Sequence, residues 1–255
     1  PLNTSGFGIY TKEKGKKEVY AGFVYVPINC GRAIDASVPL SGREQTVTVA
    51  MPLYGCVKTL YIGVTKGSMA VAAPEYKTEK PGVFYGSSIT QGGCASRPGN
   101  SYQGIMSRSM DMNYINLGFS GSGRGEKTIA DYTAGLDMSA FVLDYDHNAP
   151  TAEHLQNTHY AFYETVRAAH PDIPIVMVTR PVISPSPDEK ERIRIVRASW
   201  EKAKKNGDKN VYFIDGSRFM QGYAADAWCV DGTHPNDFGF VLMAKAMEKV
   251  LKPLL

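Results

Sequence analysis

The stretch from Val83 to Gly93 reads VFYGSSITQGG and decides how the rest of the chain is interpreted. A short apolar run that stops at Gly-Ser-Ser is typical of a buried strand that ends in a tight turn. A turn of this kind presents a hydroxyl group at the carboxyl edge of a sheet. Ser88 is therefore a candidate nucleophile, although a serine in such a turn can also serve only to satisfy backbone amides at a helix start.

A base for this serine is found near the other end of the chain, in the stretch DGTHPND from Asp231 to Asp237. A serine hydroxyl is a weak nucleophile until a base removes its proton. His234 has a carboxylate three residues before it and a proline after it, and Asp231 can orient its imidazole from the same loop. We predict a triad of Ser88, His234 and Asp231. The alternative is that His234 only marks the entry to the following helix.

Two segments between these ends can supply hydrogen-bond donors for the negative charge that develops on a substrate oxygen. NLGFSGSG, from Asn116 to Gly123, reads as a strand running into a glycine-rich turn, where the Gly121 N–H can approach a substrate. FVLDYDHN, from Phe141 to Asn148, reads as a strand ending in polar residues, and the Asn148 amide can point a second N–H at the same oxygen. The simpler alternatives are a tight turn for Gly121 and a turn cap for Asn148.

Together, these four segments resemble the four sequence blocks of the SGNH (GDSL-like) hydrolase superfamily, in order, from about residue 80 to residue 255. The resemblance implies that Ser88 is the nucleophile, His234 the base and Asp231 its orienting partner. It also implies an oxyanion hole made of the backbone amides of Ser88 and Gly121 and the side chain of Asn148.

The chain departs from the family pattern at two places: Ser87 stands where the family has Asp, and DYDHN replaces the usual Gly-x-Asn-Asp. A small β unit beside an SGNH-like domain also resembles arrangements in carbohydrate esterases. On that ground we expect a serine esterase that removes acyl groups, chiefly acetyl, from a small-molecule or oligosaccharide ester without a cofactor. The competing interpretations are a lipase or thioesterase-type acylhydrolase and a non-catalytic sugar-binding protein with a vestigial triad.

Three arginines follow the predicted site-forming strands or turns, namely Arg97, Arg124 and Arg180. They are candidates for substrate binding, although solvated loop arginines are commoner. We expect no metal site, because the histidines and carboxylates between positions 144 and 159 lack a pair with the i, i+4 spacing of a zinc motif. A dinucleotide-binding loop is not expected either, since Glu126 stands where the third glycine of that fingerprint would fall.

From about residue 82 onward, apolar runs alternate with segments of helical periodicity. The predicted strands lie near 82–86, 113–117, 140–145, 173–179 and 210–214, and the predicted helices near 100–111, 125–135, 151–170, 187–206 and 236–251. Five such units predict an α/β fold in which a parallel, flavodoxin-like five-stranded sheet lies between two layers of helices. Ligands bind such sheets at the carboxyl ends of the strands, where Ser88, Gly121 and Asn148 fall.

The first part of the chain has a different pattern of apolar and polar residues. Alternating segments at 19–26, 45–50 and 59–64 are separated by Gly, Pro and Asn turns, which is the pattern of antiparallel strands. We therefore predict a small all-β, sandwich-like accessory domain over residues 1–76 and a catalytic domain over residues 77–255. The stretch 72–81 is proline-flanked and polar, as expected of a linker.

Composition narrows the partners and the compartment. The chain has 255 residues, 43% of them hydrophobic, and its formal charge of +3 is spread without a basic run, so nucleic acid is not expected as a partner. No apolar stretch reaches the ~18 residues that a bilayer span needs. The amino end lacks an initiator Met and a signal-peptide core, so we expect a processed chain. It would be periplasmic or secreted if a signal peptide was removed, and otherwise cytoplasmic.

The four cysteines are Cys30, Cys56, Cys94 and Cys229. They are few and widely spaced, which fits neither a zinc site nor a disulfide scaffold. We expect buried free thiols. The competing interpretation is a bridge between Cys94 and Cys229 that staples the site, because each lies close in sequence to a proposed catalytic residue. The oligomeric state is left open by the sequence.

Overall fold

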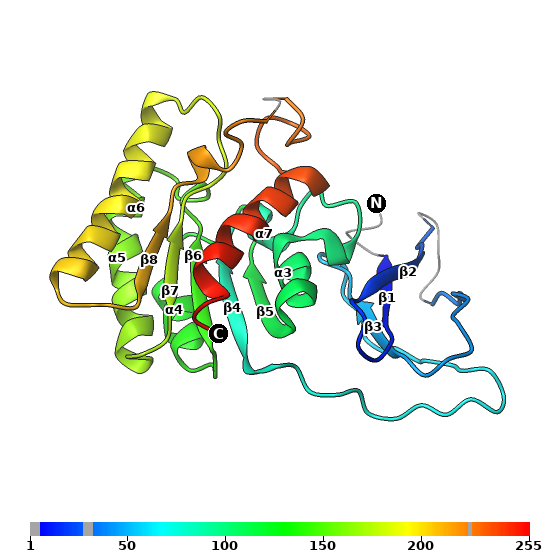
Figure 1. Ribbon diagram of the computed structural model, residues 1–255. Coiled ribbons are helices and arrows are strands. Elements are labelled where there is room, and N and C mark those ends of the chain that lie inside the picture. The colour runs from blue at the N-terminus through cyan, green and yellow to red at the C-terminus, as the bar shows by residue number, and fades with distance from the viewer. Residues whose placement is uncertain (1–5, 28–32, 224–225) are drawn as a thin grey trace.

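A computed structural model describes residues 6–27, 33–223 and 226–255 and contains two sheets (Figure 1). The antiparallel sheet has the order β2-β1-β3, from β1 (Phe7–Lys12), β2 (Val19–Val24) and β3 (Thr46–Ala50). The parallel sheet has the order β5-β4-β6-β7-β8, from β4 (Thr78–Gly86), β5 (Met112–Gly118), β6 (Ala140–Asp144), β7 (Ile175–Val178) and β8 (Val211–Ile214). The sequence-based expectation of a five-stranded parallel sheet preceded by a β unit is confirmed.

The helices are α2 (Ser88–Gln91), α3 (Tyr102–Met110), α4 (Lys127–Ala134), α5 (Ala152–Ala169), α6 (Pro187–Lys205) and α7 (Asp237–Leu251), with short 3-10 turns at Pro98–Asn100 and Gly216–Arg218. Side chains alternate across each strand, so neighbouring residues enter different cores. Phe84 and Val142 pack with α3 and α7 on one face, whereas Tyr85 and Leu143 pack with α4, α5 and α6 on the other. Two helical layers therefore cover the sheet, as predicted.

The direction in which strands are added to the parallel sheet reverses at β4. β4 is the first strand of this sheet in the chain, β5 pairs with one side of it and β6 with the other, so the chain moves to one side for β5 and returns past β4 for β6. An open α/β sheet binds its ligands at such a switch point. Ser88, the first residue of α2, follows β4 closely and thus lies at this switch point.

The β unit differs from its prediction in two ways. Its described residues form a single sheet of three strands, which includes the unpredicted β1, and no second sheet packs on it to make a sandwich. The strand predicted at 59–64 is wrong: the segment forms no strand and pairs with none, and Tyr61 and Ile62 are 90% and 70% exposed. High β-propensity makes a strand only where a neighbouring strand accepts its hydrogen bonds.

The predicted linker also ends earlier than expected, because β4 begins at Thr78. Pro81 lies in that strand, where the pairing register with β5 shifts between Thr78 and Gly82. A proline cannot donate to a ladder and is tolerated at such an irregularity. The long connection between β3 and β4 appears in Figure 1 as the cyan segment that leads to the parallel sheet.

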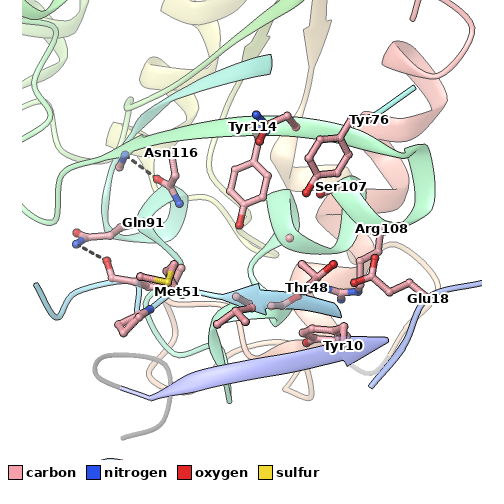
Figure 2. Close-up of a pocket in the computed structure, with 18 residues that line it drawn as sticks. Tyr10, Glu18, Thr48, Met51, Tyr76, Gln91, Ser107, Arg108, Tyr114 and Asn116 are labelled. Carbon is pink, nitrogen blue, oxygen red and sulfur yellow. Dashed lines mark hydrogen bonds between the residues drawn. The ribbon is translucent and has the colours of Figure 1, made fainter. Parts of the chain in front are cut away.

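Arginines of the larger unit hold the antiparallel sheet against it. The Arg97 guanidinium lies 4.1 Å from the ring centroid of Tyr20, and its Nε donates to the Tyr10 hydroxyl over 3.3 Å. Arg108 lies 4.2 Å from the ring centroid of Tyr10. A cavity of about 380 Å³ remains between β1, β3, α3 and β5 (Figure 2). Arg97, one of the three candidate arginines for substrate binding, is thus engaged by the β unit.

The cysteines correct one expectation. Cys56 and Cys94 are exposed and Cys229 is half-buried, and all three are free thiols, so the proposed bridge between Cys94 and Cys229 is wrong. The expectation of burial is wrong for Cys56 and Cys94, because both lie in surface loops instead of packed elements. Cys30 lies outside the described residues. Within those residues, no helix combines the length and the apolar character needed to cross a membrane.

Candidate active site

Ser88 is placed by the turn between β4 and α2. Gly86 is the last residue of β4 and lies very close to the end of β6. A Cβ on Gly86 would lie 2.1 Å from the carbonyl oxygen of Asp144, so only glycine fits. Ser87 is the N-cap of α2, and its hydroxyl accepts a hydrogen bond from the Ile89 N–H over 3.1 Å. Ser87 thus takes the capping role considered for Ser88, whose side chain is free for other contacts.

Hydrogen bonds join Ser88, His234 and Asp231 in one chain. The Ser88 Oγ lies 2.8 Å from the His234 Nε2, and the His234 Nδ1 lies 2.7 Å from an Asp231 carboxylate oxygen. The other Asp231 oxygen accepts from the backbone N–H groups of His234 and Thr233. Backbone and side-chain hydrogen bonds from His234 lower the pKa of Asp231 to about 2. Asp231 is therefore an anion that can orient the imidazole and offset its charge.

The helix after this loop begins without help from His234. Asn236 is the N-cap of α7, and its side-chain oxygen accepts from the backbone N–H groups of Phe238 and Gly239. The alternative in which His234 serves only as a helix-entry residue therefore has no support in the geometry.

The glycine-rich turn after β5 lies against the end of β4. The Phe119 N–H donates to the carbonyl oxygen of Gly86 over 2.9 Å, which anchors the turn next to the nucleophile. Gly121 has a φ of +68°, a conformation that favours glycine. Arg124 donates twice to the Gly121 carbonyl oxygen, over 3.1 and 3.0 Å. These bonds fix the turn whose N–H was predicted to serve as an oxyanion donor.

Asn148 reaches the same turn from the neighbouring strand. Its Nδ2 donates to the Phe119 carbonyl oxygen over 3.0 Å, and an amide nitrogen carries a second N–H. The helix cap considered for Asn148 is instead Thr151, whose hydroxyl accepts from the His154 N–H. The structure thus brings Asn148 to the turn of Gly121, beside the strand that ends at Gly86.

His147, one residue before Asn148, adjoins the site. It is half-buried, and burial lowers its pKa to about 4, with a further lowering by the positive charge of Arg180. The ring is therefore neutral near pH 7. Asp146, one residue earlier, accepts the backbone N–H of Arg180 over 3.1 Å, which ties this loop to the end of β7.

A buried polar cluster under the nucleophile helix was missed by sequence reasoning. The Asp144 carboxyl is buried and accepts from the hydroxyl groups of Thr90 and Tyr102, over 3.0 and 3.2 Å. Burial raises the pKa of Asp144 well above its usual range. The cluster joins β6, α2 and α3 below Ser88. Its only sequence signal was the presence of polar residues within otherwise apolar segments.

The three candidate arginines all have partners within the protein. Arg97 contacts the β unit, Arg124 binds the Gly121 carbonyl oxygen, and Arg180 forms an ion pair with Glu189. A role for them in substrate binding stays a prediction. In the described ranges, no group of three or more His, Cys, Asp or Glu side chains is arranged to hold a metal ion.

Comparison with known proteins identifies the family of this site. The model of the GDSL-like Lipase/Acylhydrolase family matches residues 79–252, which include Ser88 and His234. The chain belongs to this family. A search of curated proteins found no match. The resemblance seen in the sequence is thereby confirmed, and membership of a lipase/acylhydrolase family supports an esterase or acylhydrolase activity.

Solved structures agree with this family assignment. A GDSL-like lipase candidate from Bacteroides ovatus matches with a TM-score of 0.80 and 31% identity, over 99% of this chain and 75% of that one. A salicylyl-acyltransferase from a tetracycline biosynthetic pathway matches with a TM-score of 0.73 and 17% identity, over 99% and 80% of the two chains. A family two carbohydrate esterase from Clostridium thermocellum, in complex with cellohexaose, matches with a TM-score of 0.69 and 15% identity, over 97% and 85%.

Proposed function

We propose that this family member is a serine esterase that removes short acyl groups, chiefly acetyl, from carbohydrate esters. The observation that carries the proposal is the unbroken chain of hydrogen bonds from Ser88 through His234 to Asp231 at the carboxyl end of the central strand. A serine paired with a neutral imidazole, itself held by a carboxylate, is the arrangement that activates a hydroxyl group for attack on a carbonyl carbon.

The reaction has two steps in this geometry. The Ser88 Oγ attacks the ester carbonyl carbon while the His234 Nε2 takes the hydroxyl proton, and the same nitrogen then gives that proton to the leaving alcohol. Water attacks the resulting acyl-enzyme, with its proton passing to His234 and then to Ser88 as the acid leaves. Asp231 remains ionised throughout. Only side chains, backbone amides and water take part.

The oxyanion of each tetrahedral intermediate needs hydrogen-bond donors aimed at it. We assign these to the backbone N–H groups of Ser88 and Gly121 and to the free N–H of the Asn148 side chain. The turn that holds Gly121 is anchored to Gly86, and Asn148 is bonded to Phe119 of that turn, so the donors are fixed before substrate arrives. Pre-organised donors of this kind typically contribute ~2.7–4 kcal/mol each to transition-state stabilisation.

The proposal of a sugar ester rests on architecture. A β unit precedes the parallel sheet here, and the similar Clostridium thermocellum structure, a carbohydrate esterase, covers both parts of the chain. At 15% identity this likeness shows the fold alone, so the substrate class is an analogy. We further propose that residues 1–76 form an accessory domain and residues 77–255 the catalytic domain. The family match at 79–252 supports that division.

A substrate screen tests the proposal. Acetylated xylo- and manno-oligosaccharides, ethyl acetate, and p-nitrophenyl acetate, butyrate and palmitate are compared by kcat/KM. We expect turnover of acetyl esters, with sugar acetates preferred and palmitate poorest. Preference for palmitate would favour a lipase. Absence of hydrolysis of any ester, with binding of the oligosaccharides retained, would replace the esterase with a sugar-binding protein.

A further inference from the structure

The segment that leaves β3 lies against the nucleophile helix. Leu53 packs on the core beside α3 and α7, and its backbone carbonyl accepts a hydrogen bond of 3.1 Å from the Gln91 side chain. The contact is close: a Cβ on Gly92, just after α2, would lie 2.5 Å from the Leu53 Cδ1. Residues of the β unit thus touch the short helix that begins with Ser88.

Gln91 connects this segment to the glycine-rich turn. Its Nε2 donates to the Leu53 carbonyl oxygen, and its Oε1 accepts the Ser120 N–H over 2.9 Å. Figure 2 shows the Gln91 side chain extended toward the strand end beside Met51, with its hydrogen bond drawn. The peptide after Ser120 carries the Gly121 N–H. One amide therefore joins the nucleophile helix, the oxyanion turn and the β unit.

The hydroxyl of Tyr54, the next residue after Leu53, and the ring of His234 both lie next to Gly93. A Cβ placed on Gly93 would lie 2.8 Å from the Tyr54 hydroxyl, which is too close, and 3.6 Å from the His234 Cδ2, which is an ordinary contact, so the glycine makes room for the Tyr54 hydroxyl. Burial raises the pKa of Tyr54, and the nearby Ser120 side chain partly offsets that shift. Its side chain is nevertheless 39% exposed, which leaves part of the ring open to a bound molecule.

We propose that Tyr54 contacts the alcohol half of the ester and that Gln91 positions the oxyanion turn; this rests on the proposed esterase function. The leaving alcohol oxygen must come within hydrogen-bond reach of the His234 Nε2. In the imidazole ring, Nε2 is bonded to Cδ2. Tyr54 and that edge of the ring both border Gly93. A half-exposed tyrosine offers an apolar face for a sugar ring and a hydroxyl for its polar groups.

Tyr54 is tested with two esters that share the acetyl group and differ in the alcohol. For Tyr54→Ala, we expect kcat/KM on an acetylated oligosaccharide to fall roughly tenfold further than on ethyl acetate, mainly through KM. Tyr54→Phe should recover most of that selectivity, because it restores the ring. The control is Tyr61→Ala, a change at an exposed tyrosine of the same connection, which should alter neither rate.

An equal fractional loss on the two esters would overturn the assignment of Tyr54, and so would a loss that Tyr54→Phe fails to recover. Wild-type protein inactive on every ester would instead refute the esterase function on which the inference rests. Thermal unfolding of each variant shows whether it is folded. If Tyr54→Ala is unfolded, the test passes to Tyr54→Leu, which keeps apolar bulk but removes the planar ring.

Gln91 is tested with two variants, one that removes a single hydrogen bond of its side chain and one that removes both. Gln91→Glu keeps an oxygen for the Ser120 N–H but places an acceptor against the Leu53 carbonyl oxygen, whereas Gln91→Met removes both bonds. We expect Gln91→Met to lower kcat about tenfold or more with KM on ethyl acetate little changed, and Gln91→Glu to retain more of kcat. Equal kcat values for the two variants, or a change confined to stability, would refute the positioning role.

Discussion

The parallel sheet and the antiparallel β unit contain similar apolar residues but bury them very differently. Every residue of β6 and β7 is buried, because helices cover the sheet on both faces. Among the described strands of the β unit, only β1 has a run of buried residues, and Phe23 of β2 is half exposed. Apolar composition alone does not make a core, since burial needs a second layer to pack against.

This difference separates the roles of the two regions. Burial of apolar surface contributes about 25 cal/mol per Å², so most of the stabilising free energy must come from the covered parallel sheet. The three-stranded β unit relies on the larger unit through Tyr10, Tyr20 and Leu53. We therefore expect chemistry and stability to depend on the parallel sheet, and selectivity to depend on the contact between the regions.

The largest expected effect is loss of chemistry without loss of fold. Ser88→Ala should lower kcat on a short-chain ester by roughly 10⁴–10⁶, because the variant cannot form the acyl-enzyme. Thermal unfolding should change little, since Ser87 and not Ser88 caps the helix. Retention of more than about a tenth of the wild-type rate would rule out the serine mechanism.

A matched pair of phenylalanines compares the two regions directly. Phe141 is fully buried in the parallel sheet, whereas Phe23 is 48% exposed in the β unit. Phe141→Ala should lower the free energy of unfolding by about 3–5 kcal/mol through lost burial and a cavity, and Phe23→Ala by well under about 1 kcal/mol. Denaturant titration measures both. Similar losses would mean that Phe23 has a covering layer after all.

The next prediction concerns Asn148, which follows a strand of the parallel sheet and is the proposed side-chain donor to the oxyanion. Asn148→Ala should lower kcat by roughly 10²–10³ with KM little changed, because the lost N–H acts on the transition state. His147→Ala is the neighbouring comparison, since that ring lies at the same loop. A larger kcat loss at His147 than at Asn148 would place the donor one residue earlier in the sequence.

The smallest expected effect is on the pH dependence of stability, and it comes from His159, which is buried in the core of the parallel-sheet region. Burial lowers the pKa of His159 to about 3, and its two ring nitrogens have no hydrogen-bond partner in the described structure. The folded state thus favours the neutral ring, so this residue contributes stability above its usual pKa of ~6.5, and that contribution falls as pH decreases. At pH values well between about 3 and ~6.5, this contribution to the free energy of unfolding changes by about 1.4 kcal/mol per pH unit.

Between pH 7 and pH 5, His159→Phe should therefore lose about 2 kcal/mol less unfolding free energy than the wild type. Asp146 acts in the opposite direction, because burial raises its pKa to about 6 and a protonated carboxyl favours the folded state on acidification. Subtracting the wild-type curve removes that contribution. Parallel curves for the two proteins would show that His159 is solvated.

Sequence reasoning succeeded where the signal is local. Strand β6 and helix α5 were predicted to within a residue or so, because a run of buried residues and a 3.6-residue period each lie within one short segment. It failed for β1 and for residues 59–64, where strand formation depends on a partner that the sequence does not specify. It also missed the Asp144 cluster and the contact between Gln91 and Leu53, which join segments far apart in the chain.

The sequence by itself determined which residues are chemically able to act: a serine after a strand, a histidine with an aspartate three residues before it, a glycine in a turn and an asparagine at a strand end. The tertiary structure decided that they meet. Ser88 and His234 are 146 residues apart in the chain and 2.8 Å apart in space. That proximity follows from the strand order, which places β4 at the switch point, and from α7, whose first turn brings the Asp231 loop to the same edge. Local interactions fix turns and helix starts, whereas the pairing and packing of whole elements fix distances between remote residues.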